Sequence, residues 1–281
     1  MKSKFVVSPE WLKERLGQRD VSIVDASWYL PSHNRDAKAE YAASHIPGAV
    51  FFDIDKIADA SSSLPHMLAS SAEFAAISGA MGISETDTIV VYDGMGLFSA
   101  ARAWWNFRIM GAQNVFILDG GFPAWQAAGY PTSAETPRPA PKVFKASFNA
   151  AAVRSKQEVL KIVGSGSAQL VDSRPAERFS GAAPEPRPGL RPGHIPGAKS
   201  MPFLSFAEGG KLKDVHALKA LFEEKGFDVN APIVASCGSG VSAALVDLAL
   251  SSIGAPSHAV YDGSWAEWGM PGDTPVETGG D

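Results

Sequence analysis

The segment PIVASCGSGVSAALVDLALSSIG (residues 232–254) contains the features that decide the fold. A short apolar run ends at Cys237, a glycine-rich loop follows, and a helical pattern begins near Ser242 and ends at Gly254. A short β-rich run followed by an apolar helical run is typical of a strand buried on both faces and of the helix that covers it. The segment therefore predicts a strand, a tight loop and a helix of a parallel α/β sheet.

The same alternation occurs along the rest of the chain. Strands are predicted at VSIVDAS (21–27), TIVVYD (88–93), NVFILDG (114–120), AQLVDSR (168–174), PIVASC (232–237) and HAVYDGS (258–264). Helices are predicted at 70–82, 99–111, 216–226 and 242–254, and each of these stretches ends at a glycine. Strands that alternate with helices predict mostly parallel sheets with helices on both faces.

The two halves of the chain form an internal repeat. VDAS at Val24 corresponds to VDSR at Val171, HIPGA at His45 to HIPGA at His194, and VVYDGMG at Val90 to VASCGSG at Val234. DGGFPAW (119–125) likewise corresponds to DGSWAEW (262–268). A Pro-rich polar stretch between the halves suits a semi-extended linker. We therefore expect an N-terminal domain at 1–135, a linker at 136–148 and a second, similar domain at 149–281, with ligands bound between the domains.

Composition excludes several classes of function. The 281 residues carry a formal net charge of −5, which gives no reason to expect a nucleic acid or an anionic membrane as partner. No apolar stretch reaches the roughly 20 residues that span a bilayer, and the N-terminus has no secretory pattern, so we expect a cytoplasmic protein. A single cysteine and scattered histidines predict no disulfide and no metal site, and no phosphate-binding glycine motif predicts a nucleotide cofactor.

Cys237 is the candidate nucleophile. It lies at the carboxyl end of a predicted parallel strand, where open α/β folds place their active sites. The glycines after it allow successive backbone N–H groups to converge on an anion, and the following helix adds partial positive charge at its N-terminus. Both effects favour a thiolate and would also hold the terminal sulfur of a persulfide. The first half has Asp93 at the corresponding position, which predicts one reacting and one non-catalytic domain.

Nearly the whole chain resembles the tandem-domain rhodanese-type sulfurtransferases. CGSGVSA (237–243) is similar to the active-site loop of the branch that uses 3-mercaptopyruvate, and HIPGA, DSRPAERF, PEPR and YDGSWAEW support the resemblance. Ser242 stands where that loop usually has threonine. The resemblance implies two rhodanese-like domains, of which only the C-terminal one is catalytic, with Cys237 as its catalytic residue and a substrate-binding loop after it. The loop residues concerned are Gly238, Gly240, Val241 and Ser242.

The resemblance also implies roles for residues outside this loop. Arg178 and Arg187 match positions that hold the donor, and the planar guanidinium group suits a carboxylate and a keto oxygen. A Ser–His–Asp set maps to Ser239, His66 and Asp55, with Asp53 as the competing carboxylate; His66 with an orienting carboxylate is suited to relay protons.

We expect the remaining conspicuous residues to be structural. Arg174 is predicted to pair with an acidic neighbour. His45 and His194 recur in both halves, including the half without the cysteine, which favours a structural role. The tryptophans are predicted to pack in the cores and between the domains.

The predicted function is transfer of sulfur from 3-mercaptopyruvate through a Cys237 persulfide to thioredoxin, another thiol or cyanide. Thiosulfate-using relatives carry basic residues after the cysteine, whereas this chain has Gly238 and Ser239, which favours 3-mercaptopyruvate. Thiosulfate:cyanide sulfurtransfer and a non-enzymatic sulfur-binding scaffold remain as alternatives. A phosphatase is disfavoured because such enzymes need an arginine six positions after the cysteine, and Ala243 occupies that position.

Overall fold

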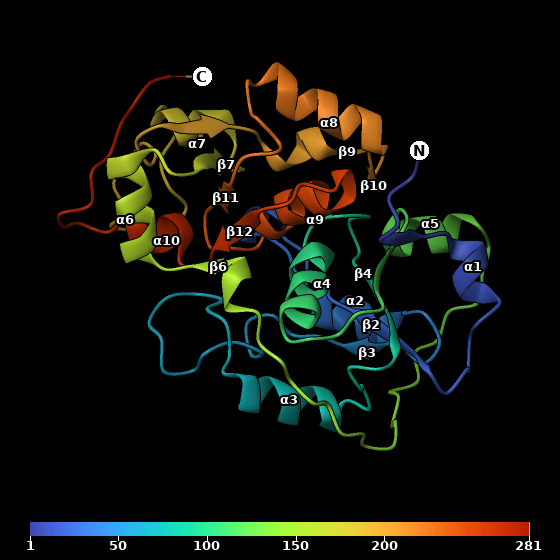
Figure 1. Cartoon of the computed structure of the whole chain (residues 1–281). Coiled ribbons are helices and arrows are strands. Elements are labelled where there is room, and N and C mark those ends of the chain that lie inside the picture. Colours follow the sequence, from blue (N-terminus) through green and yellow to red (C-terminus); the bar gives the residue numbers. More distant parts are fainter. Residues whose placement is uncertain (281) are drawn as a thin grey trace.

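The computed structural model describes residues 1–280 and contains one five-stranded sheet in each half of the chain (Figure 1). In the first sheet the strands lie in the order β1-β5-β4-β2-β3, and all neighbours are parallel. The strands are β1 (Val6–Val7), β2 (Val21–Asp25), β3 (Val50–Phe51), β4 (Thr88–Tyr92) and β5 (Val115–Leu118).

The second sheet repeats the first, position by position. Its order is β6-β12-β11-β7-β8, again with parallel neighbours. The strands are β6 (Val153–Arg154), β7 (Gln169–Asp172), β8 (Ala198–Ser200), β11 (Ile233–Ser236) and β12 (His258–Tyr261), and a separate antiparallel hairpin joins β9 (Ala207–Glu208) to β10 (Lys211–Leu212). The internal repeat and the parallel α/β class inferred from the sequence are confirmed.

Ten α-helices and three short 3₁₀ segments connect these strands in residues 1–280. The helices are α1 (Pro9–Lys13), α2 (Ala37–Ala43), α3 (Ser71–Ala80), α4 (Ala100–Ile109), α5 (Gly121–Ala127), α6 (Lys156–Ser165), α7 (Ala176–Ser180), α8 (Val215–Glu224), α9 (Ala243–Ile253) and α10 (Ser264–Trp268). The 3₁₀ segments are η1 (Pro31–His33), η2 (Ala150–Ala152) and η3 (Phe203–Phe206). No helix in this part of the chain is long and apolar enough to cross a membrane.

Both faces of each sheet are covered by helices because the strands are apolar on both sides. Along β4, Ile89 and Val91 belong to a cluster that includes α3 and α4, whereas Val90 and Tyr92 belong to a cluster that includes α1 and α5. In the second sheet, the cluster that contains Val234 of β11 includes α6 and α10. This is the continuous apolar strand pattern from which the fold was predicted.

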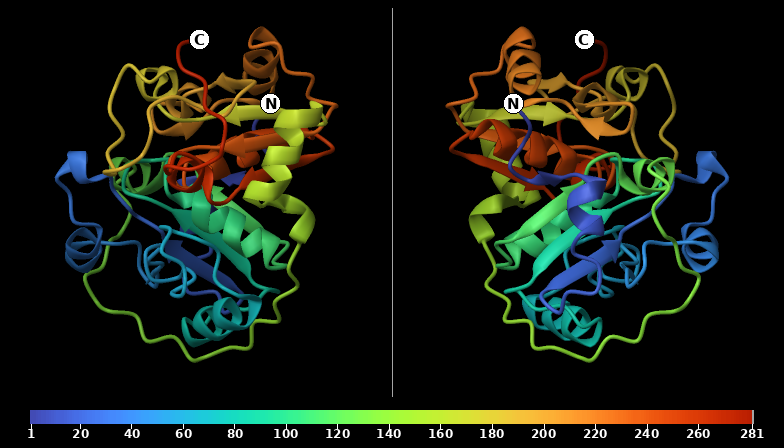
Figure 2. Two further views of the ribbon diagram at one scale, coloured as in Figure 1. Left: turned by 90° about the vertical axis from the view of Figure 1, so that its left-hand side faces the viewer. Right: turned by 90° about the vertical axis from the view of Figure 1, so that its right-hand side faces the viewer.

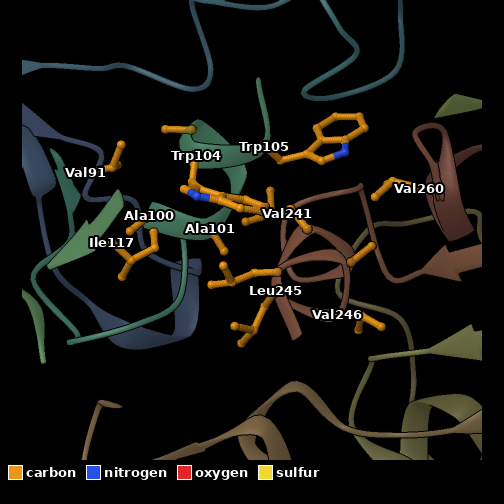
Figure 3. Close-up of a cluster of buried hydrophobic side chains, with 14 of the residues drawn as sticks. Val91, Ala100, Ala101, Trp104, Trp105, Ile117, Val241, Leu245, Val246 and Val260 are labelled. Carbon is orange, nitrogen blue, oxygen red and sulfur yellow. The ribbon is translucent and has the colours of Figure 1, made fainter. Parts of the chain in front are cut away.

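One hydrophobic cluster continues from the first half into the second. Helix α4 packs directly against α9, so that Ala101 and Trp104 lie beside Val241 and Leu245 (Figure 3). Both views in Figure 2 show this green and red helix pair between the two sheets. The halves therefore share a core, and the loops at the N-termini of α4 and α9 lie near the boundary between them.

The connection between the halves contains no helix or strand from residue 134 to residue 149. It runs along the outside of the first half, where the Lys142 N–H donates to the Gly79 carbonyl at 2.9 Å and the Ser147 N–H donates to Met110 at 2.8 Å. Phe144 is buried in the shared core. This segment is therefore irregular in structure and is docked on the first half of the chain.

Candidate active site

Cys237 follows β11, the central strand of the second sheet, and its side chain is almost fully buried, with 2% of its surface exposed. The Cys237 N–H donates to Ser264 Oγ at 3.1 Å, and this hydroxyl lies 4.0 Å from Sγ. The carbonyls of Cys237 and Gly238 accept the N–H groups of Trp265 and Ala266 at 2.9 and 2.8 Å. Contacts with α10 therefore fix the first residues of the loop.

Ser239, His66 and Asp55 form a continuous hydrogen-bonded chain. Ser239 Oγ lies 3.0 Å from His66 Nδ1, and His66 Nε2 lies 2.8 Å from Asp55 Oδ1. Trp28 Nε1 donates to the other Asp55 oxygen at 3.1 Å. The hydrogen bond from His66 is the main reason that the pKa of Asp55 lies below its usual value. Ser239 and His66 come from different halves, so the set assembles only across the domain boundary.

The competing carboxylate, Asp53, has a different partner. Its side chain pairs with Lys38 at 2.9 Å and accepts the Asp55 N–H at 3.2 Å. The structure therefore brings Asp55, and not Asp53, to His66.

The arginines near the loop differ in their surroundings. Arg174 is buried and pairs with Asp172 at 2.7 Å and with Glu185 at 2.8 Å, so the expected pairing with an acidic neighbour is confirmed. Arg178 pairs with the second oxygen of Glu185 at 2.5 Å. Arg187 has no hydrogen bond or ion pair within residues 1–280, and burial lowers its pKa, an effect that the nearby Cys237 opposes.

The glycines allow these groups to approach the loop. A Cβ atom at Gly238 would lie 3.2 Å from Nη2 of Arg178 and 3.9 Å from Nη1 of Arg187. Gly240 has a φ of +78°, which favours glycine. Val241 packs into the shared core, and Ser242 Oγ lies 3.0 Å from Ser173 Oγ.

The loop that begins at Cys237 lines a pocket between the two domains. Its walls combine apolar side chains from the first half with the arginines and the loop of the second half. The residues that line it include Trp28, Leu30, Phe98, Arg178, Arg187, Phe203, Cys237, Gly238, Ser239, Val241 and Ser242. The expectation that the site lies between the domains agrees with this arrangement.

Asp93, the counterpart of Cys237, shows what a loop of this type does with an anion. Its carboxylate accepts backbone N–H groups of Met95 at 2.8 Å, Phe98 at 2.7 Å and Ala100 at 2.9 Å. Burial raises the pKa of this carboxyl, and the N–H groups oppose that effect. In the first half, the loop therefore directs several N–H groups at one buried acidic side chain.

The paired histidines lie in structural positions. His45 stacks on Tyr41, and its ring nitrogens lie 2.7 and 3.1 Å from the carbonyls of Tyr41 and Glu135. His194 stacks on Phe179 and contacts the carbonyl of that residue at 2.9 Å. Neither lines the Cys237 pocket, in agreement with the sequence interpretation.

Sequence reasoning missed several residues around the site. Glu185 lies within the quoted PEPR motif, but its partner was not foreseen. Ser264 lies within the quoted DGSWAEW motif, but its contact with the cysteine was not predicted. Trp28 and Arg102 carry no motif, although an arginine inside the apolar run SAARAWW is a signal of a buried, paired charge. Arg102 is 1% exposed and contacts loops of both domains.

Comparisons with known proteins show the family to which the chain belongs. The rhodanese-like domain family matches residues 8–128 and 155–270. The chain is 41% identical to 3-mercaptopyruvate sulfurtransferase of Escherichia coli K12, over 99% of both chains, and 44% identical to thiosulfate sulfurtransferase of Gallus gallus, over 94% of this chain and 93% of the relative. The crystal structure of SseA, a 3-mercaptopyruvate sulfurtransferase from Escherichia coli, superposes with a TM-score of 0.86 at 39% identity, over 94% of this chain and 99% of that one. The chain therefore belongs to the rhodanese family, with one rhodanese-like domain in each half.

Proposed function

We propose that this protein is a 3-mercaptopyruvate sulfurtransferase in which Cys237 takes up sulfur as a persulfide and passes it to a thiol or to cyanide. The observation that carries the proposal is the hydrogen-bonded chain from Ser239 through His66 to Asp55 beside Cys237. Arg187, which has no ion pair among the described residues, lines the same pocket. The similarity to the Escherichia coli enzyme, which covers 99% of both chains, supports the same conclusion.

The first step is attack of the Cys237 thiolate on the donor sulfur. The new bond joins Sγ to that sulfur, and the carbon–sulfur bond breaks with its electron pair left on carbon, as pyruvate enolate. The proton of the mercapto group then replaces the sulfur on that carbon, so the products are the Cys237 persulfide anion and pyruvate. Atoms and charge balance without an oxidant, and the step requires a proton to move from sulfur to carbon.

The Ser239–His66–Asp55 chain is suited to this proton transfer. The Ser239 hydroxyl lies two residues after Cys237 and is hydrogen-bonded to His66 Nδ1. Asp55 contacts the other ring nitrogen and orients the imidazole, as a carboxylate does in other Ser–His–Asp sets. In this proposal the serine exchanges the proton with the donor, and the histidine accepts and returns it.

The loop after Cys237 is suited to hold the persulfide. Asp93 and Cys237 occupy equivalent positions, and a carboxylate oxygen is separated from Cα by the same number of covalent bonds as the terminal sulfur of a cysteine persulfide. The N–H groups that bind Asp93 therefore have counterparts in the second loop, at Ser239, Ser242 and Ala244. These groups would stabilise the sulfur anion by the same electrostatic interaction.

Arg187 and Arg178 would hold the carboxylate and keto oxygen of the donor. Arg187 is available for a bidentate interaction, whereas Glu185 already neutralises part of the charge of Arg178. Gly238 leaves room for both groups beside Cys237.

Thiosulfate is the second candidate donor, because the chicken relative bears that name at 44% identity. Its reaction leaves sulfite and needs no proton transfer, so it would leave the Ser239–His66–Asp55 chain without a role. Gly238 and Ser239 also supply no positive charge for a dianion. Both observations favour 3-mercaptopyruvate.

Acceptor, location and domain limits complete the proposal. Because Cys237 is only 2% exposed, a suitable acceptor is cyanide or a thiol on a narrow, projecting group, such as that of thioredoxin.

A cytoplasmic location is proposed from the sequence alone. The domain limits 1–135 and 149–281 are supported by the family matches, which end at 128 and resume at 155.

Intact-protein mass spectrometry tests the function. After incubation with 3-mercaptopyruvate, the reduced protein should gain one sulfur, about 32 Da, and Cys237→Ser should gain none. Thiosulfate should give the same product more slowly. A gain mainly from thiosulfate would reassign the donor, and no gain from either would contradict sulfur transfer in favour of a binding scaffold.

A further inference from the structure

Arg102 is a buried charge that lies between the two domains. It belongs to α4 of the first domain, and its side chain is 1% exposed. Nη1 lies 2.7 Å from Oδ1 of Asp262, an ion pair between the domains, and the guanidinium group also lies over the ring of Trp105. A charge this deeply buried is retained only when its partners satisfy it.

The remaining donors of Arg102 reach both loops of the active site. Nη2 donates to the carbonyl of His66 at 2.5 Å, and Nη1 donates to the carbonyl of Gly240 at 3.2 Å. Its partner Asp262 accepts the N–H of Leu68 at 2.8 Å. Arg102 and Asp262 therefore tie the loop that carries His66 to the loop that carries Cys237 and Ser239.

His66 needs such a restraint because its backbone is in the left-handed region, with a φ of +61°. This conformation is unfavourable for a residue with a side chain and persists only where surrounding contacts hold it. The hydrogen bond from Arg102 goes to the carbonyl of this same residue. Its loss would allow the peptide to relax and would turn the imidazole away from Ser239.

In the loop of the second domain, Gly240 leaves the space that the guanidinium group of Arg102 occupies. A Cβ atom at Gly240 would lie 2.7 Å from Nη1 of Arg102 and 2.9 Å from the carbonyl of Asp262. Arg102 is absent from the residues that line the substrate pocket. It therefore acts on the reacting groups only through the two loops.

We propose that Arg102 is a positioning residue that sets the hydrogen bond between Ser239 and His66 across the domain boundary. This inference rests on the proposed function, because it assigns Arg102 to the proton transfer that 3-mercaptopyruvate requires and thiosulfate does not. Both donors use Cys237 and its loop, but only 3-mercaptopyruvate depends on the orientation of His66.

The test compares the two donors in Arg102→Met. We expect kcat with 3-mercaptopyruvate to fall roughly 10- to 100-fold, since general acid–base catalysis contributes about 10²- to 10⁴-fold when it is lost completely. KM should change little, because Arg178 and Arg187 remain. The rate of persulfide formation from thiosulfate should fall much less. Arg102→Lys, which keeps a positive charge beside Asp262, should recover part of the 3-mercaptopyruvate rate.

Arg108→Met is the matched control. Arg108 lies on the same helix, is partly buried and packs on Phe5 and Trp104, but contacts neither loop. Its variant should keep the wild-type ratio of the two donor rates. If Arg102→Met leaves Asp262 unpaired and folds poorly, the double variant Arg102→Met/Asp262→Asn removes that buried charge and gives the same ratio.

The outcomes separate the two proposals. A wild-type protein that takes no sulfur from 3-mercaptopyruvate would contradict the proposed function itself. A wild-type protein that uses both donors, together with an Arg102 variant in which both rates fall in proportion or neither falls, would show that Arg102 is only structural.

Discussion

Arg178 and Arg187 lie beside the same loop but differ in what surrounds their guanidinium groups. Arg178 is paired with Glu185 at 2.5 Å, whereas Arg187 has no ion pair within residues 1–280. Arg187→Met should therefore raise KM for 3-mercaptopyruvate by about 10-fold or more, since a charge-assisted hydrogen bond contributes about 1.5–3 kcal/mol. Arg178→Met should raise it less. Steady-state kinetics with both variants, and Arg187→Lys as control, would measure the difference; equal effects would contradict it.

At this scale, sequence reasoning identified residues with a chemical signature and missed those with only a geometric one. Cys237, Ser239, His66 and Asp55 were predicted from motif positions, and the structure places them together. Arg102 was missed because its proposed role depends on hydrogen bonds to two backbone carbonyls in different domains. No local pattern contains that information.

Two helices each contain a glycine, and the two glycines differ in the space available for a side chain. Gly79 of α3 leaves no room, because a Cβ atom there would lie 2.5 Å from the carbonyl oxygen of Lys142, whereas nothing lies within 4 Å of the same atom at Gly164 of α6. Gly79→Ala should destabilise the protein by about 1–3 kcal/mol as the linker is displaced. Gly164→Ala should stabilise it by about 0.5–1 kcal/mol. Denaturant unfolding would measure both changes, and a loss at Gly164 would contradict the argument.

Among the strands, length determined whether the sequence revealed the element. The six predicted strands contain the central strands of both sheets, which are four or five residues long and buried on both faces. The edge strands β1, β3, β6 and β8 have only two or three residues, too few for a recognisable period. The linker was predicted as extended, but its docking on α3 depends on contacts with distant residues, which composition does not encode.

The two halves of the molecule have the same topology but different loops. In the first, Asp93 occupies the loop, Arg35 Nη1 donates to the Gly94 carbonyl at 3.3 Å, and Tyr29 packs against this glycine. In the second, Cys237 lines a pocket, and the apolar wall of this pocket includes Trp28 and Phe98 of the first half. The first domain thus contributes His66, Asp55, Arg102 and a wall of the pocket, although its own loop carries Asp93 in place of a cysteine.

A shared core predicts that the domains stay together without the linker. Inter-domain surfaces are often polar and mobile, but here α4 and α9 belong to one apolar cluster. A protease site inserted after the exposed Thr136 would cut the connection away from this core. The cleaved halves should co-elute in gel filtration and keep most of the 3-mercaptopyruvate activity, since Ser239 and His66 would still meet. The uncut insertion variant is the control. Separate elution of the halves would mean that the linker, rather than the core, holds the site together.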